Sequence, residues 1–202
     1  MRSYYEQRAP EYDDWWLGTG LFAARDRPGW EEDVAALKAA LGALPRARTL
    51  DVACGTGFLT EALPGDVTGI DQSETMVAVA SARLPQASFV VGDALAPPFG
   101  AGAFERVHTS HFYGHLPGDQ RAQFLATAAR LAPELIVVDS VLRPDGQPEA
   151  WQERLLNDGS RHRVYKRWFT AEGLAAELGG GETLHDGPWF VAVRTGRPSP
   201  PS

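Results

Sequence analysis

The sequence predicts an α/β fold centred on a doubly wound, mostly parallel β-sheet with helices on both faces. Two observations predict it. Short apolar runs alternate with helical runs over about 130 residues, which is the pattern of a parallel sheet with helical crossovers. Two further strand-like runs close the chain and bring the expected number of strands to seven. The chain has 202 residues, which is a length typical of one domain.

Strands are expected where apolar residues run together and end at a polar or acidic residue. The run "ELIVVDSVL" is almost continuously apolar, as in a strand that is buried on both faces. Residues 144–163 are polar and are expected to be irregular. In chain order, the expected strands are 47–53, 66–71, 87–94, 103–111, 134–142, 181–186 and 189–196.

Helices are expected where apolar residues recur every three or four positions, as in "GWEEDVAALKAALGAL". Ser73 and Thr170 each precede such a run and are predicted N-caps. Pro64 is predicted to end the helix before it. The expected helices are 29–44, 57–64, 73–85, 118–133 and 170–180.

Composition and charge limit the partners and the compartment. The net charge is −7, and an acidic chain repels phosphate backbones, so no nucleic-acid partner is expected. Cys54 is the single cysteine, which excludes an internal disulfide and suits a reducing compartment. The start of the chain is not a signal peptide, and no run of about 18 apolar residues could span a membrane. We therefore expect a cytoplasmic monomer or homodimer with no membrane association.

The stretch "DVACGTGFLT", residues 51–60, is a glycine-punctuated turn at which a phosphate, a dinucleotide or a sulfonium-bearing nucleoside could bind. A dinucleotide fingerprint needs a third glycine, but Thr60 stands in its place. Asp51 would repel a pyrophosphate, whereas it suits a ligand with an ammonium group. Asp71 and Asp93 end the next two strands and could bind ribose hydroxyls and an adenine amine. Three acids at successive strand ends indicate a cationic nucleoside.

Four motifs follow one another within residues 48–143: "LDVACGTGFLT", "VTGIDQSETMV", "ASFVVGDALAPPFGAGAFERV" and "LIVVDSVLRP". In this order and spacing, they resemble the motifs of class I S-adenosylmethionine-dependent methyltransferases, of the small-molecule type with domains like methyltransferase domains 11 and 25. The likeness extends more loosely to "YYEQRAPEYDDWW" and "YKRWFTAEGLAAEL". It implies a Rossmann-like seven-stranded sheet whose last strand is antiparallel, with S-adenosyl-L-methionine as the cofactor.

The resemblance also implies which residues hold the cofactor. Ala53 departs from the glycine usual in the family, and we expect it to have a negative φ, at which a methyl group is tolerated. The implied contacts are Asp51, Gly55, Gly57 and Ser110 at the methionine part, Asp71 at the ribose, Gln72 and Met76 beside the adenosine, and Asp93 and Ala94 at the adenine.

Residues 1–30 are predicted to form a mobile lid, with Tyr5 and Tyr12 as cofactor contacts implied by the resemblance. Residues 31–196 would form the methyltransferase domain, and 197–202 a disordered tail. Tryptophans are frequent in the lid and near the polar stretch after the fifth strand, and the family covers its substrate with these segments. Most of these tryptophans are expected in the core or at an interface, and an aromatic-lined substrate pocket is the alternative.

A catalytic base is needed only if the methyl acceptor arrives protonated, and histidine suits this role near neutral pH. His111 and His115 follow the fourth strand and are the candidates, although either could be structural or solvated. Tyr113 and Asp139 are weaker candidates, and His108 is expected in the core. No metal site is expected.

The sequence therefore predicts an enzyme that transfers a methyl group from S-adenosylmethionine to an oxygen or nitrogen of a small molecule. Two alternatives stay open. A nicotinamide-dependent oxidoreductase is disfavoured by Thr60 and Asp51. A non-catalytic S-adenosylmethionine-binding protein is not separated by sequence, because methyl transfer from a sulfonium has no obligatory catalytic residue.

Overall fold

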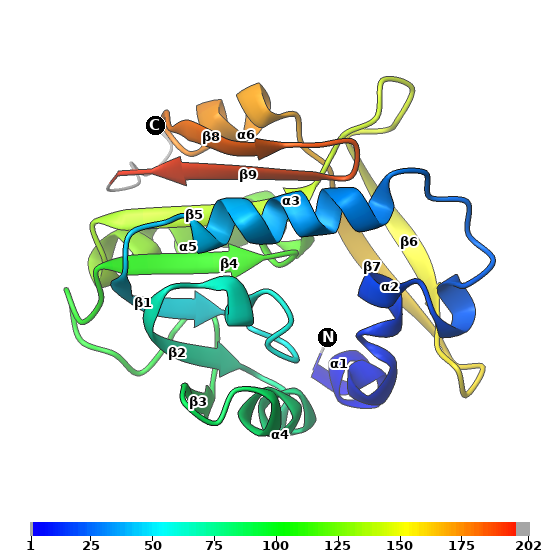
Figure 1. Cartoon of the computed structure of the whole chain (residues 1–202), viewed down its shortest axis with the longest axis horizontal. Helices are drawn as coiled ribbons and strands as arrows, with labels where there is room; N and C mark the ends of the chain where they lie inside the picture. The colour runs from blue at the N-terminus through cyan, green and yellow to red at the C-terminus, as the bar shows by residue number, and fades with distance from the viewer. Residues whose placement is uncertain (1, 197–202) are drawn as a thin grey trace.

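A seven-stranded sheet forms the centre of the computed structural model, which describes residues 2–196. Its order is β3-β2-β1-β4-β5-β9-β8 (Figure 1). The last strand, β9, is antiparallel to both neighbours, and the other pairs are parallel, which confirms the predicted fold class. The tail 197–202 lies outside the described residues. The strands are β1 (Ala47–Val52), β2 (Gly65–Asp71), β3 (Ser88–Val91), β4 (Arg106–Ser110), β5 (Glu134–Ser140), β8 (Glu182–Asp186) and β9 (Phe190–Thr195).

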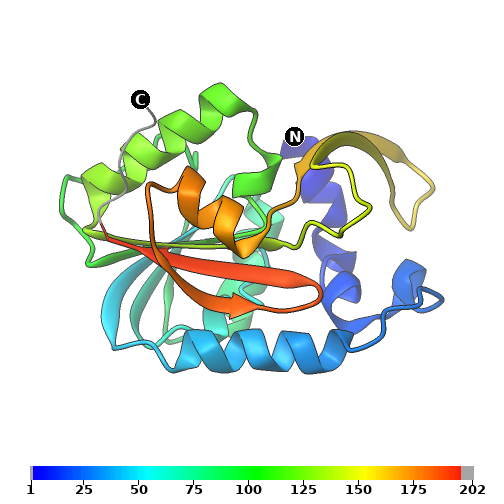
Figure 2. The same cartoon turned by 90° about the horizontal axis from the view of Figure 1, so that it is seen from above.

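Helices lie on both faces of this sheet. Figure 2 shows α3 (Trp30–Gly42) on one face, and α5 (Gly118–Leu131) and α6 (Ala171–Glu177) on the other. Helix α4 (Glu74–Arg83) packs beside β2 and β3. The predicted caps are confirmed, because the Ser73 hydroxyl accepts a hydrogen bond from the Met76 N–H in α4, and Thr170 caps α6 in the same way.

The two helical layers bury two hydrophobic clusters, and β5 contributes to both. Alternate residues of a strand point to opposite faces. Ile136 belongs to the cluster under α3, which includes Leu37, whereas Val137 belongs to the cluster under α5, which includes Phe124. This explains why the fifth strand is apolar at successive positions.

The strand order reverses at β1, which pairs with β2 on one side and with β4 on the other. In such a sheet, the crevice for a ligand lies outside the carboxyl ends of the strands at this point. The chain that follows β1 therefore lies at the mouth of the crevice.

The predicted helix at 57–64 is wrong, because this segment holds only a 3₁₀ turn, Thr60–Ala62. Gly57 has a φ of 77°, which is not helical, and Pro64 follows too soon for several α-helical turns. The segment therefore remains a compact loop between β1 and β2.

The prediction of irregular structure over 144–163 is also wrong. Strands β6 (Glu149–Leu155) and β7 (Arg161–Arg167) form an antiparallel hairpin that is separate from the main sheet. Figure 1 shows the hairpin beyond the carboxyl ends of β1 and β4, at the right of the view. It therefore lies on the ligand side of the molecule.

The N-terminal segment lies on the same side (Figure 1) and contains α1 (Arg2–Arg8) and α2 (Asp14–Leu17), with 3₁₀ turns at Ala9–Glu11 and Gly20–Phe22. Tyr4 packs with Leu156 and Val164 near the hairpin turn.

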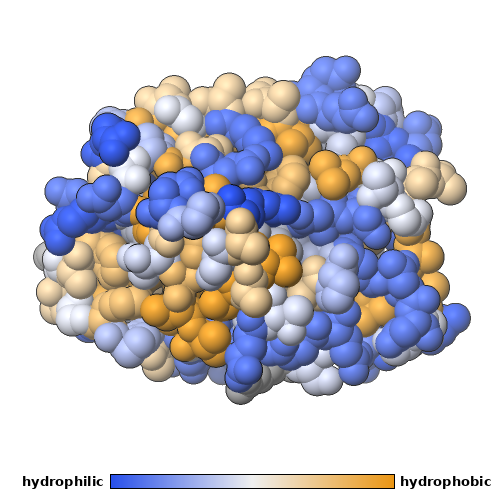
Figure 3. Space-filling view, turned by 60° about the horizontal axis from the view of Figure 1, so that its bottom comes forward, coloured by the Kyte–Doolittle hydropathy of each residue, from blue (hydrophilic) through white to orange (hydrophobic). Residues whose placement is uncertain are grey.

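The face of the molecule in Figure 3 shows hydrophobic side chains scattered among hydrophilic ones. Single exposed apolar residues such as Val91 are normal on a protein surface. Among the described helices, none has both the length and the apolar character needed to cross a bilayer.

Candidate active site

A cavity of about 140 Å³ lies at the carboxyl ends of the central strands. Asp71 ends β2, Ser110 ends β4, and the loop with Gly55 follows β1. The structure brings most of the predicted site residues together here. Those that line the cavity are Tyr5, Tyr12, Gly55, Asp71, Gln72, Met76, Asp93, Ala94, Ser110, His111 and His115.

The backbone is strained where β1 and β4 meet this cavity. Ala53 has a φ of 56° and His111 a φ of 52°. The expected negative φ of Ala53 is therefore wrong. A single non-glycine residue in the left-handed region costs roughly 1–2 kcal/mol, which the surrounding packing must offset. Gly55, with a φ of 55°, takes the same conformation, and a Cβ there would lie 3.6 Å from the Tyr12 ring.

The Asp71 carboxylate orders the loop from the end of β2. Its Oδ2 accepts a hydrogen bond from the Gly55 N–H at 3.0 Å, and its Oδ1 accepts one from the Ser73 N–H at 2.9 Å. Burial raises the pKa of Asp71, and these two hydrogen bonds oppose the rise. Each carboxylate oxygen can accept a second hydrogen bond, so Asp71 keeps capacity for hydroxyl groups in the cavity.

Two predicted cofactor residues, Asp51 and Gly57, do not line the cavity. The buried Asp51 carboxylate lies 2.8 Å from His108 Nδ1 and also accepts a hydrogen bond from the Thr60 hydroxyl. Gly57 has a φ of 77°, the left-handed conformation that a glycine adopts without strain, where the loop passes α4. His108 is fully buried, which confirms its predicted place in the core.

Tyr5 and Tyr12 reach the cavity from the N-terminal segment. Burial raises the pKa of both phenols, that of Tyr12 to about 12. They are therefore protonated near neutral pH and can donate hydrogen bonds into the cavity. The guanidinium of Arg8 stacks 5.1 Å from the centre of the Tyr12 ring.

Both candidate bases are neutral near pH 7. His115 Nδ1 lies 2.6 Å from the Tyr165 carbonyl oxygen, so this nitrogen carries the proton and donates. Burial, with a further contribution from the Lys166 charge, lowers the pKa of His115 to about 3. The same two causes, burial first, lower the pKa of His111, whose ring packs edge-on against Trp15.

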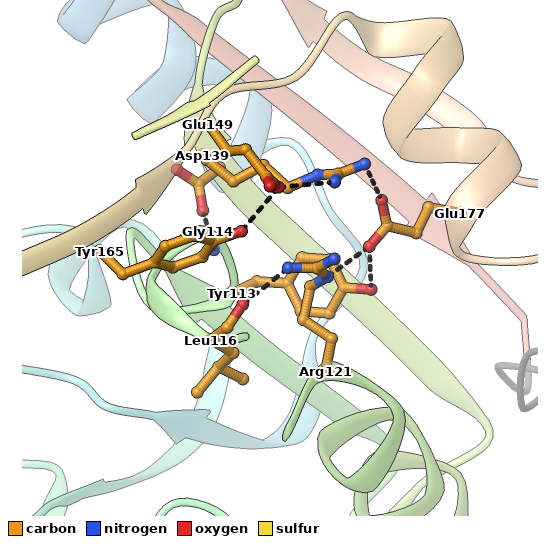
Figure 4. Close-up of polar contacts among 9 residues, drawn as sticks. Tyr113, Gly114, Leu116, Arg121, Asp139, Glu149, Tyr165 and Glu177 are labelled. Carbon is orange, nitrogen blue, oxygen red and sulfur yellow. Dashed lines mark hydrogen bonds and ion pairs between the residues drawn. The ribbon is translucent and has the colours of Figure 1, made fainter. Parts of the chain in front are cut away.

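The weaker candidates, Tyr113 and Asp139, are held in an interior network and do not line the cavity (Figure 4). The Tyr113 hydroxyl donates to Glu177, which also pairs with Arg121. The fully buried Asp139 accepts a hydrogen bond from the Gly114 N–H at 2.7 Å. Burial and the Glu177 charge raise the pKa of Tyr113, which does not suit it for proton transfer near neutral pH.

A second, smaller cavity of about 50 Å³ shares Tyr5, Tyr12, His111 and His115 with the first. Cationic side chains line it, and none of them was predicted from the sequence. Its other lining residues are Arg8, Trp15, Ser140, Arg154 and Lys166.

A cleft of about 740 Å³ continues from this smaller cavity and shares Trp15, Ser140, Arg154 and Lys166 with it. Tryptophans of the N-terminal segment and of the chain after β5 line this cleft, as expected for an aromatic-lined pocket. The tryptophans are Trp15, Trp30, Trp168 and Trp189.

Two of the three missed cations, Arg154 and Lys166, come from the hairpin that was expected to be irregular, and the third, Arg8, ends α1. In β6 and β7, alternate residues face the cleft, which places Arg154 and Lys166 on the inward face. The signal that could have found them is the dipeptide Asp158-Gly159, a strong hairpin turn between two alternating runs.

The fold, the cavity at the switch in strand order and the matches to known proteins define the class. Residues 49–134 match a family model described as a methyltransferase domain. Over these residues the chain is similar to the class I S-adenosylmethionine-dependent methyltransferases, and these likenesses support S-adenosylmethionine as its cofactor.

Individual relatives agree with this class. The structure solved as the DhpI-SAM-HEP complex is 26% identical, with a TM-score of 0.76 over 97% of this chain and 95% of that chain. The DhpI-SAH complex is also 26% identical, with a TM-score of 0.71 over 98% of this chain and 95% of that chain. A demethylmenaquinone methyltransferase of Renibacterium salmoninarum is 42% identical over 113 residues, which are 54% of this chain and 45% of that protein. The chain spans less than half the length of the curated relatives it matches.

Proposed function

We propose that the protein transfers the methyl group of S-adenosylmethionine to an oxygen or nitrogen of a small-molecule acceptor. One observation carries the proposal. The strand-end cavity and the cation-lined cavity share a wall of Tyr5, Tyr12, His111 and His115. The first would hold the donor and the second the acceptor, so both histidines would stand where the two reactants meet.

The lining of the strand-end cavity fits the cofactor. Asp71 keeps acceptor capacity for ribose hydroxyls. Met76 and Ala94 offer apolar surface for an adenine ring, and Asp93 stands at the same end of the cavity for its amine. Gly55 leaves the loop backbone without a side chain where the methionine part would lie. When bound, the cofactor supplies an activated methyl group and needs no further activation by the protein.

Asp51 and Gly57 would then support the shape of the loop without lining the cavity. Asp51 forms hydrogen bonds with Thr60 and His108, and Gly57 has the positive φ with which the loop passes α4. Their effect on the cofactor would be indirect, through the shape of the loop between Gly55 and Thr60.

The histidines would orient the acceptor. Because His115 donates its Nδ1 proton to the Tyr165 carbonyl, its Nε2 carries a lone pair. That nitrogen can accept a hydrogen bond from an O–H or N–H group and so orient the acceptor, whereas a pKa of about 3 makes it too weak a base to take the proton near neutral pH. His111 lines the same two cavities and is the alternative.

The N-terminal segment would close over both reactants. Tyr5 and Tyr12 line both cavities, and exclusion of water by such a segment favours an in-line displacement between positioned groups. The names of the curated relatives, demethylmenaquinone methyltransferases, support a small molecule as the acceptor rather than a macromolecule.

The test is to follow an isotope-labelled methyl group. The protein is incubated with labelled S-adenosylmethionine and a fraction of small metabolites, and labelled products are sought by mass spectrometry with Asp71→Ala as the control. Label in small molecules, reduced at least tenfold by the variant, is the expected result. Label confined to protein or nucleic acid would contradict the proposal. A thermal shift with NAD and none with S-adenosylhomocysteine would favour the oxidoreductase alternative.

A further inference from the structure

Cations gather on the acceptor side of the proposed site. Arg8, Arg154 and Lys166 line the small cavity, and Arg27 and Arg143 line the cleft beyond it, where Asp26 is the one carboxylate among the described lining residues. In the part of the chain that the structure describes, the four arginines of this group form no ion pair. This concentration of positive charge opposes the net charge of −7 of the whole chain.

Arg154 is the central residue of this group, because it lines both the cavity and the cleft. Its guanidinium makes no hydrogen bond to any described residue. Two outward-facing arginines of the same hairpin differ, since Arg161 pairs with Glu153, and Arg167 pairs with Glu149. The third, Arg163, forms no ion pair with any described residue but stacks over the exposed Trp151 ring, so Arg154 is the unpaired arginine of the hairpin that faces the cleft.

A charge that leaves water without a partner is unfavourable. Burial lowers the pKa of Arg154, with further contributions from the charges of Arg8 and Arg25, while Tyr4 and Tyr5 oppose the change. Lys166 has a partner, the buried Asp139, and burial still lowers its pKa. These cations lie close together around partly buried cavities, and an anionic ligand would offset their mutual repulsion.

The chemistry of the group selects the ligand. A guanidinium presents a planar fork of N–H donors that matches the two oxygens of a carboxylate or a phosphate. Trp15, which is partly exposed, lines the cleft beside these arginines and offers apolar surface to the rest of such a ligand.

Resting on the proposed function, we propose that the methyl acceptor is a small anion whose carboxylate or phosphate group is bound by Arg154 and Arg8, next to His115. Arg27 and Arg143 at the cleft would guide the anion inward. Each stacks on a tryptophan, Arg27 on Trp30 and Arg143 on Trp189, so their charges stay at fixed positions.

The test measures binding and not turnover. Calorimetry is performed on protein saturated with S-adenosylhomocysteine, at low ionic strength, with benzoate, phenyl phosphate and the neutral benzamide as probes. Benzoate or phenyl phosphate should bind at least tenfold more tightly than benzamide, and the two anions compared with each other separate the carboxylate from the phosphate class. Arg154→Gln should weaken anion binding at least tenfold, and Arg154→Lys should restore part of it. Arg161→Gln, on the outer face of the hairpin, is the matched control and should bind like the wild type.

Thermal melting shows whether the variant is folded. Removal of an unpaired charge should leave the melting temperature of Arg154→Gln equal to or higher than that of the wild type, so weaker binding would not reflect misfolding. Binding of benzamide as tight as that of both anions, or equal anion affinity in Arg154→Gln and Arg161→Gln, would overturn the proposal. Failure of the wild type to bind S-adenosylhomocysteine would instead refute the proposed function.

Discussion

Ala53 and His111 carry the backbone strain of the site, and the sequence has no signal for it. Both have a positive φ at the ends of the neighbouring strands β1 and β4. Neither is a glycine, so local preference predicts the opposite conformation. Packing imposes the strain, because the His111 ring is enclosed by Trp15, Trp16 and Phe190, which come from distant parts of the chain.

The strand-end acids show what spacing predicts and what it does not. Asp71 and Asp93 line the cavity, as expected from parallel strands whose carboxyl ends meet at one edge. Asp51 was expected there too, but it pairs in register with His108 across β1 and β4, and the two side chains contact each other. This neighbour is known only once the pairing of the strands is known.

The side chain of Asp71 should determine cofactor affinity. Hydrogen bonds from ribose hydroxyls to a carboxylate contribute roughly 1.5–3 kcal/mol, so Asp71→Ala should weaken binding of S-adenosylhomocysteine by about tenfold or more. Calorimetry measures the affinity, and circular dichroism checks the fold. Asp71→Asn is the matched control for the loop, because its amide oxygen can still accept one backbone hydrogen bond. Unchanged affinity in Asp71→Ala would mean that Asp71 only caps the Gly55 and Ser73 amides.

At the scale of elements, the periodicity of apolar residues predicts the helices and strands that are buried between layers. It does not predict elements that are largely exposed. The helices 29–44 and 118–133 were predictable because one side of each packs on the sheet. The hairpin of β6 and β7 is half exposed and largely polar, so it has no apolar pattern, and its inward face carries charge instead. In a mostly polar segment, the sequence pattern does not distinguish a strand from a loop. The hairpin can be predicted only if its turn residues are recognised.

The N-terminal segment has two parts with different anchors. Trp16 is buried in the cluster under α3, and its carbonyl oxygen accepts a hydrogen bond from Trp30 Nε1. Before it, the chain is held by polar contacts to α4 and by the small cluster of Tyr4 with the hairpin, since Glu6 accepts hydrogen bonds from the first amides of α4, and Asp13 pairs with Arg83. The predicted lid motion therefore concerns residues 2–13, which contain Tyr5 and Tyr12.

Hydrogen exchange tests this lid. Protection of residues 2–13 should rise when S-adenosylhomocysteine binds, whereas residues 14–17 should be protected in both states because Trp16 is packed in the core. Deletion of residues 1–13 should lower cofactor affinity and keep the melting temperature of the sheet within a few degrees of that of the full chain. Equal protection of residues 2–13 with and without the ligand would show a fixed element and not a lid.

At the scale of the whole molecule, the order of the motifs predicts the topology of the sheet. The composition does not predict where the charges lie on the surface. Alternating strands and helices leave few ways to wind a sheet, because crossovers are right-handed. Net charge is a sum over the surface, and the value of −7 gave no sign of the cations at the cleft. Where the charges lie depends on the hairpin, which is the element that periodicity missed.

The neutral buried histidines should make the stability of the molecule depend on pH. The pKa of His115 is about 3 in the fold, against about 6.5 in the unfolded chain, and the pKa of His111 is lowered too. The unfolded chain therefore binds more protons between these values, so the free energy of unfolding should fall as the pH falls below about 6.5. At pH 5 the loss from His115 alone should be about 2 kcal/mol.

Urea unfolding at pH 7, 6 and 5 measures this dependence, in a range above the pKa of ordinary carboxyl groups. His115→Asn is the informative variant, because its amide can still donate a hydrogen bond to the Tyr165 carbonyl and does not titrate. The variant should lose less stability than the wild type between pH 7 and 5, and the remaining loss should reflect His111. An equal loss in both proteins would show that His115 becomes protonated in the folded state at ordinary pH. This result would then contradict the lowered pKa of His115 and the enclosed surroundings that explain it.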